Sequence, residues 1–578
     1  MYLRSTQRRN RDGSVVRYLQ LAHNHRVDGT TQAKVLLNLG REDGLDRDGL
    51  VRLVASINRY LGEPVAPPPA AELLGDALTV TGSRPMGTAY LLDALWRTLG
   101  VDEALRKVLG PRRFTTDVER VLFALVANRA IDPASKLAAA EWVTYDAAIP
   151  GLAVMDEDQA YRAMDLLVDA DAQAQVQEAV FFAVANLLNL EVDLLLFDTT
   201  STYFERDTEE PEQGGFRRYG HSKDHRADLP QIVIGLAVTK EGIPVRCWCW
   251  PGNTADQAVL PEVRDGMRDW RLGRVVTVVD RGFSSKENLD YLTRAGGHYI
   301  AGERMRSGAP LVEQALSRQG RYKQVRDNLR VKEIRLDAAP ARRWVICHNP
   351  DQAQLDKAQR DAALERITTE LARIDTMRSN AAKTGSAAKS RTLKTKSNDT
   401  GSATADEAAH VKAECALRDH RALGRWLTQR PSGRLVIDRA KVAAEQRLDG
   451  KYLLTTSDPH LSAADVALGY KNLLEAERGF RDLKSILELR PVFHRIEPRI
   501  RAHVLLCWLA LLLIRVAERR TGQTWNRIST ELGRLHAVTL TGTAGSVVHL
   551  TPLTTAQTGI LRACQVPAPP TVTALNPA

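Results

Sequence analysis

The stretch VDLLLFD, from Val192 to Asp198, is a mainly apolar run that ends in an acid. RVVTVVD, from Arg274 to Asp280, has the same form, and two further apolar runs lie between them at 229–239 and 243–250. Strands that are apolar throughout are typical of a sheet with both faces covered. These four runs therefore predict an α/β domain at the centre of the chain, with helices on both sides of its sheet.

Two of the predicted strands end in an aspartate, Asp198 and Asp280. An uncompensated carboxylate beside a buried strand is costly, so each needs a hydrogen-bond partner or a metal ion. If the two strands are neighbours, both carboxylates face the same cleft, because functional groups gather at strand ends in such sheets. The alternative for each acid is a structural one, since aspartates at strand ends commonly cap the next turn.

A third acid, Glu477, lies in the stretch YKNLLEAERGFRDLK from Tyr470 to Lys484, which has the spacing of a helix. Tyr470, Glu477 and Lys484 are seven residues apart, so a continuous helix returns them to nearly the same face. Arg481 shares that stripe, and a neighbouring apolar stripe packs inward. The alternative is a charged face that only meets solvent.

If this helix brings Glu477 to Asp198 and Asp280, the three carboxylates form one cluster. Hard oxygen ligands of this kind select Mg²⁺ or Mn²⁺ rather than zinc. Two such ions support in-line attack at phosphorus. The chain has 578 residues and a net charge of +10, which suits a polyanion such as DNA.

Several motifs around these acids have a recognisable form. Asp198 lies in FDTTSTYFE, Asp280 opens DRGFSSKENL, and Glu477 stands between Tyr470 and Lys484 at the stated spacing. The stretches YGHSKDHRADLPQIVIGLAVTKEGIPV and PGNTADQAVL accompany them. Together they resemble a DDE transposase of a bacterial insertion sequence, in the insertion-sequence-four group with the Tyr-Arg-Glu-Lys signature. The resemblance covers roughly 190–300 and 450–515.

The resemblance implies an RNase H-like catalytic core, a mixed sheet flanked by helices, with a mostly β insertion between the second aspartate and the glutamate. It implies that Asp198, Asp280 and Glu477 are the catalytic acids and hold two Mg²⁺ or Mn²⁺ ions, with Asp198 bridging both. The expected partners are the terminal inverted repeats of the element and target DNA, which a homodimer brings together in a synaptic complex.

The resemblance also implies DNA contacts. Tyr470 and Lys484 would bind phosphate near the transposon end, whereas the signature arginine position holds Leu473. Arg478 and Arg481 are the nearest replacements for that arginine.

The loop GGFRRYGHSKDHR adds Lys223 and Arg226 as candidates for contact with the DNA backbone, and the alternative is a basic surface loop without such a role. Its two histidines, four residues apart, suggest zinc, but Ser222 stands where a zinc hydrolase has glutamate.

Composition divides the chain into regions. The N-terminal region 1–62 combines strands with a helix-like segment, and the Pro-rich 63–71 forms a hinge. The helical region 72–190 either contains a DNA-reading pair of helices or is a plain bundle. The remaining expected regions are the first part of the core (191–299), an insertion (300–457) with a helical arm (351–428) and a mobile tip (377–404), the second part of the core (458–560), and a disordered tail (561–578).

The apolar run from Val504 to Ile514 has eleven residues and is too short to cross a bilayer, so it predicts a buried helix. No export signal is visible at the N-terminus, and we expect a cytoplasmic protein without membrane contact.

Two other functions stay open. A transposon-derived DNA-binding protein without catalysis would need none of the three acids. Glycoside hydrolysis would need two carboxyl groups and no metal, and the basic residues around the acids disfavour it.

Overall fold

The structure is a computed structural model, and it describes most of the chain. The described residues are 2–9, 15–27, 30–45, 50, 53, 54, 57, 78–110, 117–169, 172–190, 192–205, 208–210, 215–268, 270, 274–392 and 401–577. The chain separates into two compact units: Met1–Ser83 with Val538–Leu550 and Pro570–Ala578, and the remainder. The expected hinge at 63–71 and most of the helix-like segment before it lie outside the described residues.

The first unit is built from β-strands. An antiparallel sheet contains β1 (Tyr2–Arg9), β2 (Val15–Val27) and β3 (Thr30–Arg41), and a 3₁₀ turn, η1 (Glu42–Gly44), follows. A four-stranded sheet has the order β18 (Val572–Pro577), β17 (Gly545–Leu550), β16 (His536–Gly542) and β4 (Thr79–Pro85).

The expectation of a disordered tail at 561–578 is therefore wrong. Residues 555–563 belong to α19 (Thr555–Ala563), and β18 pairs antiparallel with β17, with Val547 opposite Leu575. Pro567, Pro569 and Pro570 cannot donate backbone hydrogen bonds, but the residues after them form a strand that pairs with β17 and extends the sheet.

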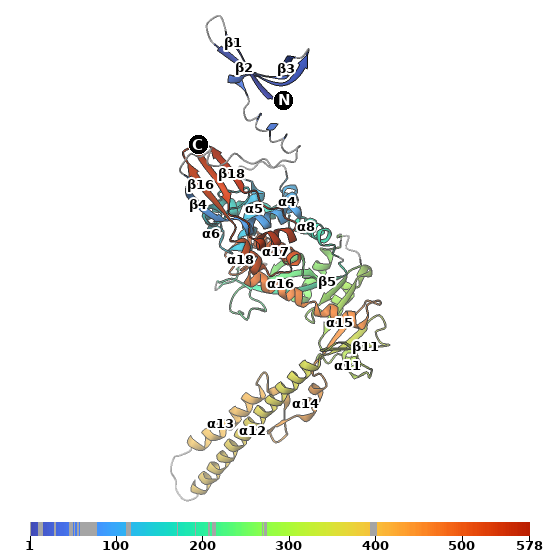
Figure 1. Cartoon of the computed structure of the whole chain (residues 1–578). Helices are drawn as coiled ribbons and strands as arrows, with labels where there is room; N and C mark the ends of the chain where they lie inside the picture. Colours follow the sequence, from blue (N-terminus) through green and yellow to red (C-terminus); the bar gives the residue numbers. More distant parts are fainter. Residues whose placement is uncertain are drawn as a thin grey trace. The chain divides into compact units, whose positions relative to one another are not determined.

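A nine-stranded mixed sheet organises the second unit (Figure 1). Its order is β10 (Lys323–Arg326), β11 (Leu329–Arg335), β12 (Arg343–His348), β15 (Lys451–Thr456), β9 (His298–Glu303), β8 (Val276–Val279), β5 (Leu194–Tyr203), β6 (Gln231–Thr239) and β7 (Pro244–Pro251). The neighbours β5, β8 and β9 are parallel, and the other pairs are antiparallel. This confirms the α/β class, and strands from the predicted insertion extend the central sheet.

Helices pack against this sheet or against one another. They are α3 (Gly87–Thr98), α4 (Val101–Leu109), α5 (Val118–Ile131), α6 (Lys136–Glu141), η2 (Trp142–Asp146), α7 (Glu157–Asp169), α8 (Ala172–Leu188), α9 (Asp256–Asp265), α10 (Lys286–Leu292), η3 (Arg294–Gly296), α15 (Ala463–Lys471), α16 (Leu474–Ser485), α17 (Glu497–Thr521) and α18 (Trp525–Leu532). One hydrophobic cluster joins α3–α8, α17 and one face of the sheet. The helices of 72–190 therefore share a core with the sheet, and α5, buried from Val118 to Ala130, has no face free to read DNA.

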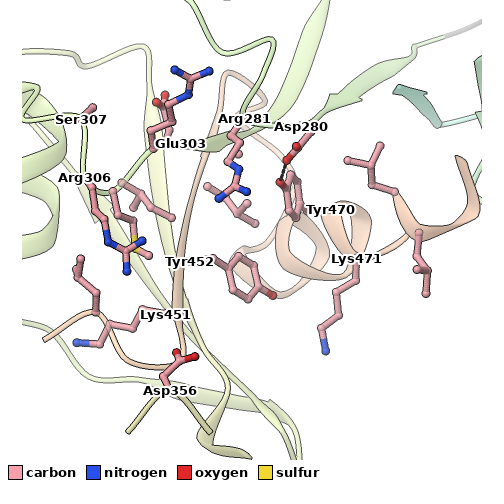
Figure 2. A pocket seen from close by; sticks show the side chains of 18 of the residues that line it. Asp280, Arg281, Glu303, Arg306, Ser307, Asp356, Lys451, Tyr452, Tyr470 and Lys471 are labelled. Atoms are coloured by element: carbon pink, nitrogen blue, oxygen red, sulfur yellow. Dashed lines mark hydrogen bonds between the residues drawn. The ribbon is translucent and has the colours of Figure 1, made fainter. Parts of the chain in front are cut away.

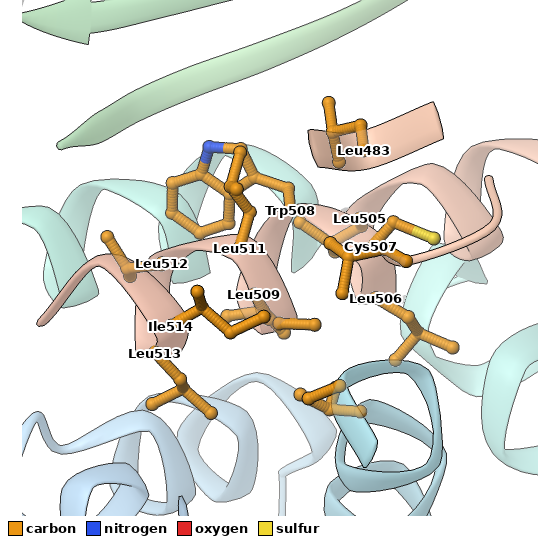
Figure 3. Close-up of a cluster of buried hydrophobic side chains, with 14 of the residues drawn as sticks. Leu483, Leu505, Leu506, Cys507, Trp508, Leu509, Leu511, Leu512, Leu513 and Ile514 are labelled. Atoms are coloured by element: carbon orange, nitrogen blue, oxygen red, sulfur yellow. The ribbon is translucent and has the colours of Figure 1, made fainter. Parts of the chain in front are cut away.

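The predicted buried helix at 504–514 is confirmed as the centre of α17. Figure 3 shows its apolar side chains, with Leu483 of α16 beside them. By length and composition α17 could cross a membrane, but 94% of its most apolar window is buried inside the protein. Burial of this kind is what a core helix requires, so the helix is weak evidence for membrane insertion.

The arm consists of two helices, α12 (Pro350–Thr392) and α13 (Gly401–Arg418). Ile367 and Ile374 of α12 are buried against Leu417 of α13, as their spacing predicts. The region 377–404, expected as a mobile tip, is helical wherever the structure describes it, and 393–400 lie outside the described residues. Its many Ala, Lys and Arg residues are good helix formers. The smaller elements beside the arm are α11 (Pro310–Ser317), η4 (Gly424–Trp426), β13 (Leu427–Gln429), β14 (Leu435–Ile437) and α14 (Arg439–Gln446).

Candidate active site

Asp198 lies on β5, and Asp280 directly follows the neighbouring strand β8. β5 and β8 run parallel with Phe197 opposite Val279, so the two aspartates follow at the same level. The sequence suggested that the strand ends at Asp198. In the structure β5 continues to Tyr203 and pairs there with β6. Only the pairing with β8 stops at Phe197, which leaves Asp198 at an open edge beside Asp280.

The expected single helix over Tyr470–Lys484 is interrupted. α15 ends at Lys471 and α16 begins at Leu474. Between them the N–H of Leu473 donates to the carbonyl of Tyr470 at 3.0 Å, an i→i+3 bond that tightens the turn. The prediction that Tyr470, Glu477 and Lys484 share one face of one helix is therefore wrong: Glu477 and Lys484 lie on α16, and Tyr470 lies on α15.

Tyr470 is directed at the second aspartate (Figure 2). Its phenol donates a hydrogen bond to Oδ1 of Asp280 at 2.6 Å. Burial raises the pKa of Tyr470, and the charge of Asp280 raises it further, so the phenol keeps its proton. A Cβ at Gly302 would lie 2.4 Å from the phenolic oxygen, so only glycine leaves room for this contact. Tyr470 therefore orients Asp280.

A cavity of about 1250 Å³ opens beside this pair. Asp280, Tyr470 and the exposed Glu477 line it, so two of the three predicted acids face one space. Its cationic lining residues are Arg281, Arg304, Arg306, Lys451 and Lys471, four of which are labelled in Figure 2. A cavity that combines carboxylates with these cations suits a polyanion that must be held near acids.

The three acids are not gathered into a metal-binding cluster. Within the described part of the chain, no three His, Cys, Asp or Glu side chains lie close enough to hold an ion. Their donor set is nevertheless the one that Mg²⁺ or Mn²⁺ prefers, because it consists of carboxylate oxygens alone. The same observation gives no support to a zinc site at His221 and His225.

A lysine supplies positive charge beside Asp198. Lys223 Nζ lies 4.0 Å from Oδ1 of Asp198 and 3.2 Å from Oδ2 of Asp256. It also donates to the carbonyl and the hydroxyl of Thr199, at 2.8 and 2.6 Å. Burial raises the pKa of Asp198 to about 6, Lys223 opposes this rise, and the charges of Asp280 and Asp256 add to it. Asp198 therefore sits where a cation is stabilising.

Asp256 is a residue to which sequence reasoning assigned no role. It begins α9 and accepts a hydrogen bond of 2.6 Å from the hydroxyl of Thr199. The motif PGNTADQAVL contains it, but an acid in the first turn of a helix has an ordinary structural explanation. Only the fold brings Asp256 to the lysine beside Asp198.

Lys484 is engaged inside the protein. Its Nζ donates to Oδ1 of Asp224 at 2.8 Å and to the hydroxyl of Thr200 at 2.7 Å. Arg490 contacts the same oxygen of Asp224 at 2.8 Å. The side chains of Lys484 and Asp224 are only 14% and 8% exposed, so this lysine ties α16 to β5 and to the loop that follows it.

The other side chains predicted to contact DNA differ in solvent exposure and in their ion pairs within the protein. The side chain of Arg481 is 68% exposed, whereas Arg478 lies 3.3 Å from the carboxylate of Glu518. Arg226 pairs with Asp228 at 2.8 Å. Leu473, at the signature arginine position, is buried in the core. Arg481 is thus the predicted contact on α16 that is best placed to meet a ligand.

Comparisons with known proteins agree with the motifs. Residues 3–70 match the family model described as IS1634 family transposase, N-terminal domain, and residues 193–513 match the transposase DDE domain. A search of curated proteins found no match. Among solved structures, the cryo-EM structure of the piggyBac transposase synaptic complex with hairpin DNA is similar at 9% identity and a TM-score of 0.35. That match covers 78% of this chain and 82% of the other.

Proposed function

Because the chain belongs to the DDE transposase family, we propose that Asp198, Asp280 and Glu477 form its catalytic centre. The prediction of an insertion-sequence transposase is confirmed by the two family matches. The observation that supports the site is the register of β5 and β8, which sets Asp198 beside Asp280. The cavity that Asp280 shares with Glu477 adds the third acid to the same region.

The RNase H-like core, in this proposal, consists of β7, β6, β5, β8 and β9 with the helices that cover them. A mixed sheet flanked by helices supports this assignment. The predicted insertion would then begin after β9 and return through β15, so that α16 follows it with Glu477.

The three carboxylates would hold two Mg²⁺ or Mn²⁺ ions. When bound, such ions activate the attacking oxygen and stabilise the leaving oxygen at phosphorus. Tyr470 holds Asp280 in a fixed orientation through its 2.6 Å hydrogen bond. Lys223 lies 4.0 Å from Oδ1 of Asp198 and compensates part of its charge.

DNA is the substrate expected of the family, and the basic lining of the cavity suits its phosphates. The enzyme would nick the DNA at the terminal inverted repeats and join the freed 3′-OH to a target. Synapsis of two ends would use a homodimer, and the reaction would take place in the cytoplasm. Arg481 would contact the DNA backbone from α16, since its side chain is exposed.

The test is Mg²⁺-dependent nicking of a duplex that carries the element end. Asp198→Asn, Asp280→Asn and Glu477→Gln should each abolish nicking and leave binding of the end largely intact. Glu475→Gln is the matched control, because Glu475 lies on the same helix and does not line the cavity.

A DNA-binding protein without catalysis is the second candidate, and the presence of Asp198, Asp280 and Glu477 argues against it. Wild-type protein that binds the end without nicking it, at any Mg²⁺ or Mn²⁺ concentration, would establish this alternative. Loss of binding in all three acid variants would remove the catalytic assignment.

A further inference from the structure

A second cavity adjoins the catalytic one, inside the region 300–457. It has a volume of about 360 Å³. Both cavities are lined by Met305, Arg306, Leu448 and Lys451, so the second begins where the first ends. A ligand that extends beyond Glu477 along this wall would therefore reach the second cavity.

Positive charge dominates its lining. Six cations line it: Arg306, Lys332, Arg425, Lys441, Arg447 and Lys451. The acids are Glu313 and Glu445, and Glu445 is already held by Arg306 through two contacts of 2.7 Å. The cavity is therefore left with a clear excess of positive charge.

Three lysines from three different elements converge on it, and each is positioned by a backbone carbonyl. Lys332 of β11 donates to the carbonyl of Arg318 at 2.8 Å, and Lys441 of α14 to that of Leu427 at 2.8 Å. Lys451 of β15 donates to the carbonyl of Arg447 at 2.7 Å.

These carbonyls orient the lysines without neutralising them. An ammonium group has three donors, so each keeps two for a ligand. Where the chain is described, none of the three forms an ion pair with a carboxylate.

The environment of the cavity disfavours the charged form of two of these lysines. Burial lowers the pKa of Lys332, and the charge of Lys451 lowers it further. Burial also lowers the pKa of Lys451, with Arg447 adding to the effect and Asp449 opposing it. Cations that line one cavity repel each other, and an anion in the cavity would relieve that repulsion.

We propose that this cavity binds phosphodiester groups of a DNA strand that continues from the catalytic cavity. The inference rests on the proposed function, which makes DNA the ligand of the neighbouring site. Lysine binds phosphate as a point charge, and three ammonium groups with free donors suit tetrahedral oxygens of variable position. The shared wall of the two cavities favours a continuous strand over a small free anion.

The experiment measures how binding of a long element-end duplex depends on salt, for the full chain and for Lys332→Gln/Lys441→Gln, because these two lysines line the second cavity and not the first. Each lost phosphate contact lowers the slope of log K against log salt by about 0.9. We therefore expect the slope to fall by about one to two, with unfolding temperature unchanged. Lys332→Arg/Lys441→Arg should keep the wild-type slope. Lys107→Gln, an exposed lysine on α4 away from both cavities, is the control.

The outcomes separate the two proposals. A slope and an affinity that stay at wild-type values would overturn the cavity assignment, even if Mg²⁺-dependent nicking continues. The DNA assignment would also fall if inorganic phosphate raised the unfolding temperature of wild type alone while the DNA slope stayed unchanged, because the cavity would then serve a small anion. A reduced slope in a protein that never nicks DNA would support the cavity and refute catalysis.

Discussion

Replacing Lys484 with methionine separates two roles for this residue, internal support and direct DNA contact. Methionine keeps most of the length and apolar volume of lysine but removes its charge. The variant loses the 2.8 Å contact with Asp224 and the 2.7 Å bond to Thr200, while Arg490 still contacts Asp224. The perturbation therefore weakens a buried ion pair without leaving its acid wholly uncompensated.

The expected cost follows from that geometry. Removing both cations from a buried carboxylate would cost about 3–5 kcal/mol. Because Arg490 remains, we expect the unfolding free energy to fall by the value of about one charge-assisted hydrogen bond, about 1.5–3 kcal/mol. Since α16 also carries Glu477, the loosened helix should lower the nicking rate more than it lowers the affinity for DNA.

Two measurements test this reasoning: urea unfolding, and the salt dependence of end binding. An unchanged unfolding free energy, together with a salt slope reduced by about 0.9, would refute the internal role and restore a phosphate contact. Arg481→Met is the matched control on the same helix, with a 68% exposed side chain. It should change stability by less than about 0.5 kcal/mol and lower the salt slope. Combining Lys484→Met with Asp224→Asn should cost less than the sum of the single variants.

Three further variants test other parts of the structure. Tyr470→Phe removes the hydrogen bond to Asp280, worth about 1.5–3 kcal/mol, so single-turnover nicking should slow about ten- to a hundredfold while end binding is unchanged. Gly302→Ala places a methyl group against the same phenol, and nicking assays should show a defect at least as large as that of Tyr470→Phe. Burial lowers the pKa of Lys136 to about 7 in the folded protein, below its pKa in the unfolded chain. Above pH 7 this lysine is therefore protonated in the unfolded chain but largely neutral in the folded protein. Unfolding free energy should therefore rise between pH 7 and 9 by about 1.4 kcal/mol per unit from this group. Lys136→Met should remove that part of the slope in urea titrations, and equal slopes in the two proteins would contradict the argument.

The sequence by itself determined the elements that consist of continuous apolar residues, because such residues must be buried. The apolar runs before Asp198 and Asp280 became β5 and β8, and the run at 504–514 became the centre of α17. A continuous apolar segment is stable only when it is buried, whichever residues it packs against. Its burial can therefore be predicted without knowing the fold. The motifs around the acids likewise identified the family, because they depend on residue type and spacing alone.

Tertiary structure alone decided which polar groups meet. The bond from Tyr470 to Asp280 spans 190 residues, and the pair of Lys484 with Asp224 spans 260. The tight turn before α16 also has no clear local signal, yet it moves Tyr470 off the face of Glu477. The residue type of a polar side chain predicts which kind of group it can bind. Which residue it binds depends on how distant segments pack together. For the same reason the sequence alone did not predict the contact of Asp256 with Lys223, the pairing of β18 with β17 or the second basic cavity.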